Sequence, residues 1–369
     1  MLPLEAPKRI AVIGPCADDP QAFFGCYSFP NHVLPQYPDF QGNLGIEAKS
    51  LLTALRREFP AAEVGYQQGC EVAGGDLSRL EAAVAEAEAS DVVLLAVGDR
   101  AGMFGGGTSG EGCDVPDVSL PGYQPELVEA ILRTGQRTVL VSVSGRPYAL
   151  GQYLGRTAAL VQAFFLGEEG GAALAGVLSG RINPSGKLPV GIPRRPGGQP
   201  YTYLAPPLGQ NSEGVSNLDP TPALPFGHGL SYTSFRHENL QVSAAKVDTA
   251  GTVDVSVFVA NDGTRDGDEV VQLYASDPVA CVTRPVTQLI GFARIHLTAG
   301  QSTQVRFSVH TDRLSFTGPD MKRIVEPGEM IFRIGTAGAT YAGPVSVQLA
   351  GPTRAVVGER VMDTPFTIR

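Results

Sequence analysis

The stretch DVVLLAVG, residues 91–98, decides the fold of the first half of the chain. After Asp91 it is an unbroken apolar run, which is typical of a strand buried on both faces of a sheet. Because such strands pack in parallel sheets, we expect a parallel sheet in this part of the chain. The other stretches that predict strands here are RIAVIG (9–14), AEVGYQQG (62–69), TVLVSVSG (138–145) and ALVQAFF (159–165).

Amphipathic helical stretches alternate with these strands. Asp76 opens one of them, directly before Leu77, and Gly135 and Gly180 close two others, as is usual at helix starts and ends. The alternation predicts an α/β sandwich over residues 1–195, with a mainly parallel sheet and helices on both faces. The helical stretches are IEAKSLLTALRREF (46–59), DLSRLEAAVAEAEAS (76–90), YQPELVEAILRTG (123–135) and EEGGAALAGVLSG (168–180).

The second half of the chain has a different pattern. Residues 196–236 are irregular and rich in Pro, Gly and Asn. They predict a linker, and its aromatic residues indicate that it packs on the surface of its neighbours. Residues 237–369 contain short alternating runs separated by turns, with no helical pattern, which predicts an all-β sandwich. The expected strands are TVDVSVFVAN (252–261), DEVVQLYAS (268–276), PVTQLIGFARIHL (285–297), TQVRFSVH (303–310) and EMIFRIGTA (329–337).

Composition narrows the classes of function. The chain has 369 residues, enough for two or three domains, and a formal net charge of −9, which argues against a nucleic-acid partner. No apolar run approaches the roughly 20 residues that span a bilayer, and the start MLPLEAPKRIAVIGP lacks the parts of a secretion signal, so no membrane association is expected. The five cysteines form no C-x-x-C pair, which favours reduced thiols and a cytoplasmic protein.

Directly after the strand at 91–98 comes an unusual loop. Residues 98–114 read GDRAGMFGGGTSGEGCD, with a formal G-x-G-x-x-G at Gly105, Gly107 and Gly110. A dinucleotide site needs this motif directly between strand and helix, but here the next helical stretch begins only near Gly122. The phosphate-loop-like GRINPSGKL (180–188) also departs from its pattern, in spacing and in having Leu188 where Ser or Thr is required. Nucleotide binding therefore has little support.

The loop offers one candidate for chemistry, Glu111. Ligands of open α/β sheets bind beyond the carboxyl ends of the strands, where this loop should lie. A carboxyl group there suits general acid/base catalysis, and the flanking glycines let the backbone approach a substrate and adapt to it. The alternative is that Glu111 is a solvated loop residue and that the glycines only make turns. No catalytic carboxylate pair is visible in the loop, and the histidines show no metal-binding spacing, so no metal or cofactor is expected.

Several motifs in this order resemble the C-terminal part of glycoside hydrolase family 3. They run over nearly the whole chain, and they are specific in combination. The resemblance implies an α/β sandwich followed by a fibronectin type III-like domain, without the family's N-terminal TIM-type barrel. The motifs are GTSGEGCD, VSLPGYQPELVEAIL, VLVSVSGRPYAL, FFLGEEGGAALAGVLSGRINPSGKLPVGIPR, LPFGHGLSYTSF and GDEVVQLYASDPVACVTRPVTQLIGFARIHLTAGQS.

The resemblance also implies a role for Glu111. In SGEGCD it matches the family's general acid/base, which the sandwich domain supplies to a site on the barrel. The family's nucleophile is an aspartate of the barrel, and MLPLEAPKRIAVIG resembles the point at which a full-length member leaves that domain. A retaining mechanism needs both carboxyl groups, about 5–5.5 Å apart, so this chain is expected to be inactive alone. A barrel, in cis or in trans, is the implied partner.

Four further residues of the loop are candidates for the site. Asp99, Arg100 and Phe104 are expected to contact sugar hydroxyls or a ring face, and Asp114 to hydrogen-bond the loop into shape. The alternatives are that Asp99 and Arg100 pair with each other and that Phe104 is a packing anchor. Cys113 is expected to be a packed thiol because no activating partner is visible.

The leading hypothesis is therefore the acid/base-bearing part of a retaining, exo-acting β-glucosidase or β-xylosidase that acts on oligosaccharides or β-glycosides. Two alternatives remain: a non-catalytic carbohydrate-binding or protein-interaction module that has lost its barrel, and a flavodoxin-like nucleotide binder. The choice between glucose and xylose is not encoded in these residues. A face left open by the missing barrel would favour self-association, so a homo-oligomer is also expected.

Overall fold

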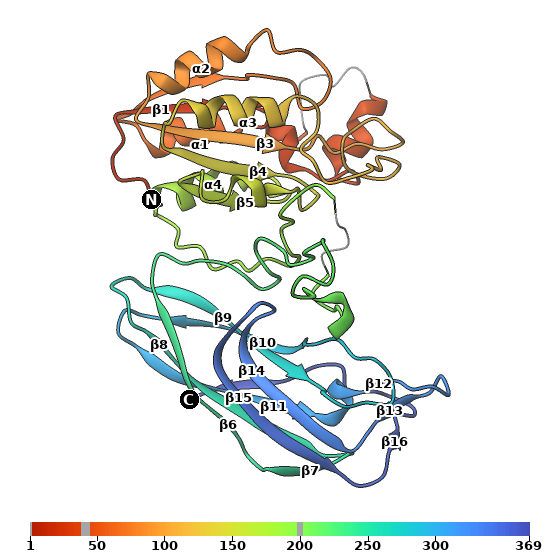
Figure 1. Cartoon of the computed structure of the whole chain (residues 1–369). Coiled ribbons are helices and arrows are strands. Elements are labelled where there is room, and N and C mark those ends of the chain that lie inside the picture. The colour runs from red at the N-terminus through yellow and green to blue at the C-terminus, as the bar shows by residue number, and fades with distance from the viewer. Residues whose placement is uncertain (1, 38–44, 198–201) are drawn as a thin grey trace. The chain divides into compact units, whose positions relative to one another are not determined.

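The computed structural model of the chain describes residues 2–37, 45–197 and 202–369 and divides into two compact units (Figure 1). Unit 1 runs to Ile182 and includes residues 193–197. Unit 2 comprises residues 183–192 together with the chain from 198 onward. Each unit has its own hydrophobic core. None of the helices in the described ranges has the length and apolar character to cross a membrane.

Unit 1 is built on the parallel sheet that the apolar runs predict. Its strand order is β2-β1-β3-β4-β5, and every neighbouring pair is parallel. This confirms the α/β fold class. The strands are β1 (Arg9–Ile13), β2 (Glu63–Gln67), β3 (Val92–Gly98), β4 (Thr138–Val143) and β5 (Ala159–Gln162).

Four helices cover the two faces of this sheet. Helix α1 packs against α4, and α2 packs against α3. Each lies within a predicted helical stretch but is shorter than it. The helices are α1 (Leu51–Glu58), α2 (Leu80–Glu88), α3 (Gln124–Arg133) and α4 (Gly170–Ser179).

The alternation of side chains along the strands explains why both faces are covered. Every residue of β3 is buried, so neither face of this central strand meets water. Leu94 and Ala96 point into a core cluster with Leu55 of α1 and Leu178 of α4. Their neighbours in sequence point to the other face, where α2 and α3 contribute buried residues such as Leu127. The continuous apolar run at 91–98 therefore forms a strand that is buried on both faces, as its sequence predicts.

Unit 2 is all-β, as expected. Its two main sheets have the orders β10-β9-β14-β15-β7 and β17-β11-β8-β6, and a small sheet has the order β12-β13-β16. The strands are β6 (Phe235–Val242), β7 (Lys246–Asp248), β8 (Thr252–Asn261), β9 (Gly267–Ser276), β10 (Gln288–Leu297), β11 (Ser302–His310), β12 (Phe316–Thr317), β13 (Arg323–Val325), β14 (Gly328–Thr336), β15 (Ala339–Ala350), β16 (Arg354–Ala355) and β17 (Phe366–Ile368).

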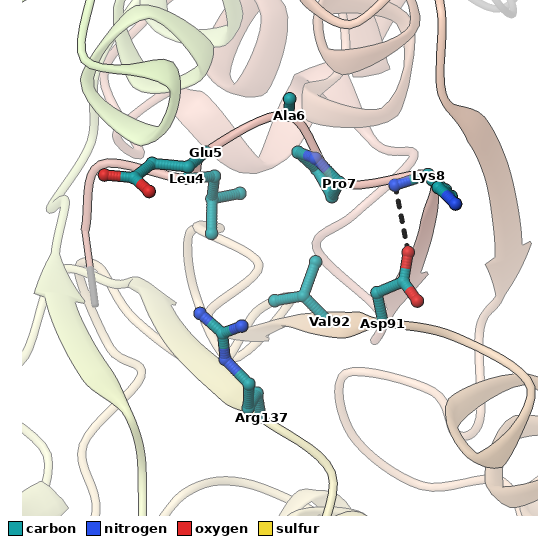
Figure 2. Close-up of a pocket in the computed structure, with 8 residues that line it drawn as sticks. All are labelled: Leu4, Glu5, Ala6, Pro7, Lys8, Asp91, Val92 and Arg137. Atoms are coloured by element: carbon teal, nitrogen blue, oxygen red, sulfur yellow. Dashed lines mark hydrogen bonds between the residues drawn. The ribbon is translucent and has the colours of Figure 1, made fainter.

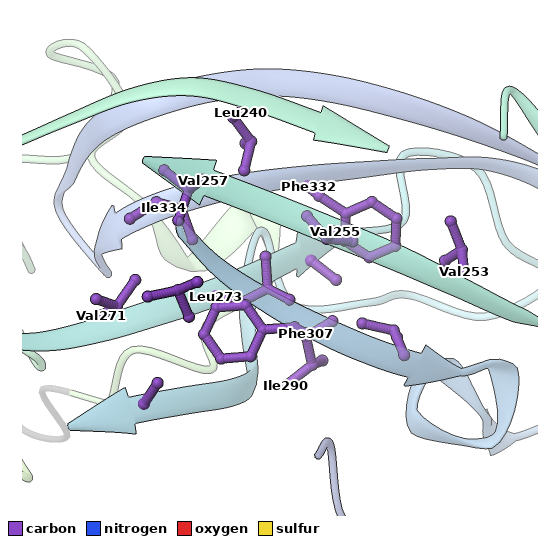
Figure 3. Packing of buried hydrophobic residues seen from close by; sticks show 14 of the residues in the cluster. Leu240, Val253, Val255, Val257, Val271, Leu273, Ile290, Phe307, Phe332 and Ile334 are labelled. Atoms are coloured by element: carbon purple, nitrogen blue, oxygen red, sulfur yellow. The ribbon is translucent and has the colours of Figure 1, made fainter. Parts of the chain in front are cut away.

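The core of unit 2 lies between its main sheets (Figure 3). Val253, Val255 and Val257 alternate along β8 and all point inward, toward Phe307 of β11 and Phe332 of β14. This period of two is what the alternating runs predict for a sheet with one buried face.

The boundaries between the parts differ from the expected ones. The predicted first domain, 1–195, contains residues 183–192, which belong to unit 2. There, the Ile192 N–H donates to the Leu224 carbonyl at 2.8 Å, so part of the predicted linker, 196–236, is paired within unit 2. Farther along the linker, the ring of Phe226 stacks on Tyr203 at 4.1 Å. Residues 198–201 of the linker lie outside the described residues.

Candidate active site

The loop of interest begins where β3 ends, at the carboxyl edge of the sheet of unit 1. Gly98, the last residue of β3, has its N–H and its carbonyl bonded to the side chain of Gln124, at 2.7 and 2.8 Å. Gln124 is the first residue of α3 and is fully buried. Gln124 therefore fixes the first residue of the loop to helix α3.

Asp99 is buried beneath the loop, with an exposed fraction of 0%. Its carboxylate accepts hydrogen bonds from the Thr108 hydroxyl at 2.7 Å, the Gly145 N–H at 2.9 Å and the Tyr148 hydroxyl. Burial and the neighbouring Asp99 raise the pKa of Tyr148, which keeps its hydroxyl a donor. The sequence predicted a sugar contact for Asp99, but the structure gives it a supporting role because its acceptors are occupied and closed off from solvent.

Arg100 points away from Asp99. Its guanidinium forms an ion pair with Asp19 and a hydrogen bond to the Gln21 side chain at 3.2 Å. The alternative in which Asp99 and Arg100 pair with each other is therefore wrong. Arg100 links the base of the loop to a segment after β1, and its side chain stays partly exposed.

The loop is folded back on itself by backbone hydrogen bonds. The Gly102 N–H donates to the Ser109 carbonyl at 2.9 Å, and the Phe104 N–H donates to the Glu111 carbonyl at 2.8 Å. A side chain on Gly107 would meet the backbone of Gly102, at 2.5 Å from its nitrogen. Gly107 thus serves close backbone packing, whereas Gly105 has no atom nearer than 4.0 Å to an added carbon.

Arg146 closes the loop from the end of β4. Its two terminal nitrogens donate to the carbonyl oxygens of Thr108 and Cys113, which flank Glu111 on either side. Sequence reasoning expected Asp114 to shape the loop, but Asp114 is exposed, and no hydrogen bond to its side chain is found within the described ranges. Arg146 lies in the motif SGRPYAL, so the motif was visible, but its contact with the loop was not.

Glu111 and Phe104 are the exposed side chains at the tip. Glu111 accepts a hydrogen bond from the hydroxyl of Tyr27, which comes from the segment after β1. Phe104 is 80% exposed and has φ of 53°, so it is not the packing anchor that was considered as an alternative. Cys113 is buried, with its thiol 3.7 Å from the Gly102 carbonyl, as a packed thiol should be.

A separate pocket of about 440 Å³ lies at the opposite, amino edge of the sheet (Figure 2). It is lined by residues 4–8 and by Asp91, Val92 and Arg137, which precede or begin β1, β3 and β4. Asp91 is already bonded to the backbone N–H groups of Lys8 and Arg9, at 2.9 Å each. This pocket contains none of the loop residues. No group of metal-ligand side chains was found in the part of the chain that the structure describes.

Family models match both units. The C-terminal domain of glycosyl hydrolase family 3 matches residues 1–232, and a fibronectin type III-like domain matches residues 269–337. The chain belongs to glycosyl hydrolase family 3. Family 3 membership confirms the resemblance seen in the motifs of the sequence, including the fibronectin type III-like character of the second part.

Relatives in family 3 are longer than this chain. A β-xylosidase of Formosa agariphila is 35% identical over 91% of the chain, which covers 46% of that enzyme. A periplasmic β-glucosidase of Salmonella typhimurium is 33% identical, with 92% and 46% covered. The chain thus spans about half the length of the curated relatives it matches.

Solved structures agree with this assignment. A β-glucosidase involved in saponin metabolism from intestinal bacteria superposes with a TM-score of 0.84 at 28% identity, covering 95% of this chain and 52% of that one. A β-glucosidase of Listeria innocua in complex with glucose gives 0.80 at 27% identity, covering 95% and 47%. The fold and the family are therefore established for this chain.

Proposed function

We propose that this chain supplies the general acid/base, Glu111, to a retaining β-glycosidase whose nucleophile lies outside the chain. The observation that supports this proposal is the state of Glu111: its carboxyl group is exposed at the tip of a loop whose base is fixed by Asp99 and Arg146. A catalytic group has to be held in place by its supports and still reach a substrate.

The other two carboxylates of the loop, Asp99 and Asp114, do not complete the pair. Asp99 is buried and fully engaged, so it is not a nucleophile. Asp114 is exposed but lies on the same loop, three residues from Glu111. The resemblance that the motifs carry implies an aspartate on a TIM-type barrel as the second group, so a barrel, in cis or in trans, is the proposed partner.

The chemistry divides into two steps. In the first, the second carboxylate attacks the anomeric carbon, the bond from that carbon to the glycosidic oxygen breaks, and the departing oxygen takes the proton of Glu111. In the second, Glu111 takes a proton from water, whose oxygen bonds to the anomeric carbon as the carboxylate leaves. Phe104 offers an exposed face to a sugar ring, and Arg100 a partly exposed guanidinium to hydroxyl groups.

The proposal is tested in a chimera in which this chain replaces the matching half of the Formosa agariphila β-xylosidase. Glu111→Gln should slow turnover of phenyl β-glucosides and β-xylosides by roughly 100- to 10,000-fold because the departing oxygen loses its proton donor. With a dinitrophenyl β-glycoside, whose leaving group departs without a proton, added azide should speed the second step and yield a glycosyl azide, since this anion attacks without a general base. Initial rates and product analysis measure both effects.

Glu88→Gln is the matched control, because Glu88 is an exposed carboxylate at the end of α2. Its turnover should equal that of the unmodified chimera. A folded chimera without activity, or a Glu111→Gln chimera with full activity, would contradict the proposal. Sugar binding without hydrolysis, measured by calorimetry, would instead support a non-catalytic binding module.

A further inference from the structure

The hydroxyl of Tyr27 is the one group found to donate to the Glu111 carboxylate among the described residues. The two residues are 84 positions apart, and Tyr27 comes from the segment that follows β1. Tyr27 is 64% exposed, so its hydroxyl does not need this partner to avoid burial without a hydrogen bond. Burial of the Tyr27 hydroxyl therefore does not explain this hydrogen bond.

The segment that carries Tyr27 is held in one conformation by its own hydrogen bonds. The Gly25 carbonyl accepts from the Ser28 N–H at 3.1 Å and from the Ser28 hydroxyl at 2.6 Å, which closes a turn around Tyr27. The buried Asn31 donates to the Phe24 carbonyl at 2.6 Å. His32 packs edge-on against the Tyr27 ring, with centroids 5.6 Å apart. These contacts orient the Tyr27 ring.

The same segment is tied to the loop that carries Glu111. Arg100 at the base of the loop binds Asp19 and Gln21, and Gln21 in turn donates to Asn31 at 2.7 Å. At the tip, the backbone of Gly110 lies against Cys26. A side-chain carbon added to Gly110 would be only 3.3 Å from the Cys26 sulfur. The segment that carries Tyr27 and the loop that carries Glu111 are therefore in contact at two places, the base of the loop at Arg100 and its tip at Gly110.

The phenol is a donor in this contact. The hydrogen bond to Glu111 is the largest of the effects that raise the pKa of Tyr27 above its ordinary value, with Cys26 contributing in the same direction. Tyr27 hence keeps its proton at neutral pH. Among the described residues, the groups beside it that can carry charge are Glu111, Cys26 and His32.

We infer that Tyr27 is a positioning residue for Glu111, an inference that rests on the proposed acid/base role. Its hydroxyl donates to the Oε2 atom, which leaves Oε1 to carry the transferable proton. When that proton passes to the departing glycosidic oxygen, the carboxylate that remains keeps a donor on Oε2. A hydrogen bond to a charged group is stronger than one to a neutral group, so the phenol assists the step in which Glu111 becomes charged.

The contact itself can be tested on this chain alone. With tyrosine labelled at the ring carbon that bears the hydroxyl, NMR follows the ionisation of each of the 11 tyrosines, and Tyr27→Phe identifies the resonance of Tyr27. Glu111→Gln should lower the pH at which Tyr27 ionises, toward the ordinary value of about 10. Asp114→Asn removes a nearby carboxylate that does not accept from Tyr27 and should leave that pH unchanged. Equal titration of Tyr27 in the wild type and in Glu111→Gln would overturn the inference.

The role in proton transfer is tested in the chimera described above. Tyr27→Phe should lower kcat about 10-fold for phenyl β-glycosides, the low end for one hydrogen bond to a charged group, with little change in KM. It should have almost no effect on dinitrophenyl β-glycosides, whose leaving group departs without a proton. Tyr123→Phe removes an exposed phenol from the same unit and should change neither rate. A merely structural role of Tyr27 would lower both rates alike.

The two proposals fail in different ways. If Glu111→Gln abolishes turnover but Tyr27→Phe affects all leaving groups equally or not at all, the positioning role is wrong and the acid/base role stands. If Tyr27 titrates with Glu111 as expected but Glu111→Gln retains full activity, the acid/base role is wrong and the positioning role falls with it.

Discussion

At the scale of single residues, the position of Glu111 depends on the side chains of Asp99 and Arg146, which support its loop. Asp99 accepts from Thr108 of the loop and from Gly145 and Tyr148 beneath it, and Arg146 donates to two carbonyl oxygens of the loop. Charged side chains that bind backbone groups in this way fix the position of a neighbour with little freedom left. Changes at these two positions should therefore alter the order of the loop before they alter its chemistry.

Arg146→Lys provides a direct test of this support. Lysine keeps the charge but lacks the planar fork that reaches the Thr108 and Cys113 carbonyls together. Losing the second bond should let the loop open more often and speed amide exchange of Phe104 and Thr108 by roughly 10- to 100-fold. Hydrogen-exchange mass spectrometry measures this rate.

The control for Arg146→Lys is Arg156→Lys. Arg156 forms an exposed ion pair with Glu129 at 2.7 Å, and surface pairs contribute little to stability. It should leave exchange in the loop at the wild-type rate. Unchanged exchange in Arg146→Lys as well would show that the loop holds its shape without the guanidinium.

The sequence revealed Glu111 but not its surroundings. A carboxylate among glycines after a buried strand is a local pattern, and so it was visible. The donors that meet it or its loop, Tyr27 and Arg146, are 84 and more than 30 positions away, and such contacts follow from the tertiary fold. The burial of Asp99 was not foreseen for the same reason, since one of its donors, Tyr148, is 49 positions away.

At the scale of elements, the end of β3 is where the sheet meets the site. Gly98 has φ of 146°, and a side chain there would collide with the carbonyl of Val143 on β4. Glycine alone permits this approach, which brings the last residues of β3 and β4 together and places Asp99 beside Gly145.

Gly98→Ala should destabilise unit 1 by roughly 3 kcal/mol, from the collision and the strained backbone together. Urea unfolding followed by circular dichroism measures the change. Gly135→Ala is the matched variant, since Gly135 also has positive φ, 73°, but nothing lies within 4 Å of an added carbon. It should cost only about 1 kcal/mol. Equal losses in the two variants would mean that the contact with β4 does not matter.

Elements were predicted well where their sequence pattern is strong. All five strands of the parallel sheet lie within the predicted stretches. The pattern is strongest in β3 and β4, which are buried throughout, and weakest in β2, whose residues are half-buried or exposed. By contrast, the two long strands β6 and β15 and the short strands β7, β12, β13, β16 and β17 were not anticipated. Strand β6 is a polar edge strand, and β15 has mostly exposed residues and contains Gly343-Pro344, which removes a backbone donor and disguises the pattern.

At the scale of the whole molecule, each unit carries its own core, so the two can differ in how they respond to pH. In unit 2, burial, and secondarily Lys187, lowers the pKa of His237 from 6.5 to about 4. Its ring packs against Tyr341, and its Nε2 atom lies 3.9 Å from Glu269, with no hydrogen-bond partner among the described residues. The folded unit therefore takes up this proton only at low pH.

This histidine should make unit 2 less stable in acid. The unfolded chain binds the proton near pH 6.5 and the folded unit near pH 4, so stability falls as the pH drops through this window and levels off below it. The full effect is on the order of 3 kcal/mol. Burial raises the pKa of Glu269, which acts in the opposite direction, so a comparison of variants is needed.

His237→Phe keeps the ring contact with Tyr341 and removes the titrating group. Its unfolding free energy should fall less than that of the wild type between pH 6.5 and pH 4. Urea unfolding, followed through NMR of labelled valine methyl groups in the core of unit 2, measures both proteins. Parallel curves would show that His237 is protonated as easily in the folded unit as in the unfolded chain.

The backbone hydrogen bonds within the loop, from Gly102 to Ser109 and from Phe104 to Glu111, have a consequence for the timing of assembly. If this chain and a barrel are mixed as separate chains, the loop that carries Glu111 is already folded when the two chains meet. Turnover should then begin without a lag, and its onset should follow the concentrations of the two chains rather than a slow rearrangement of either one.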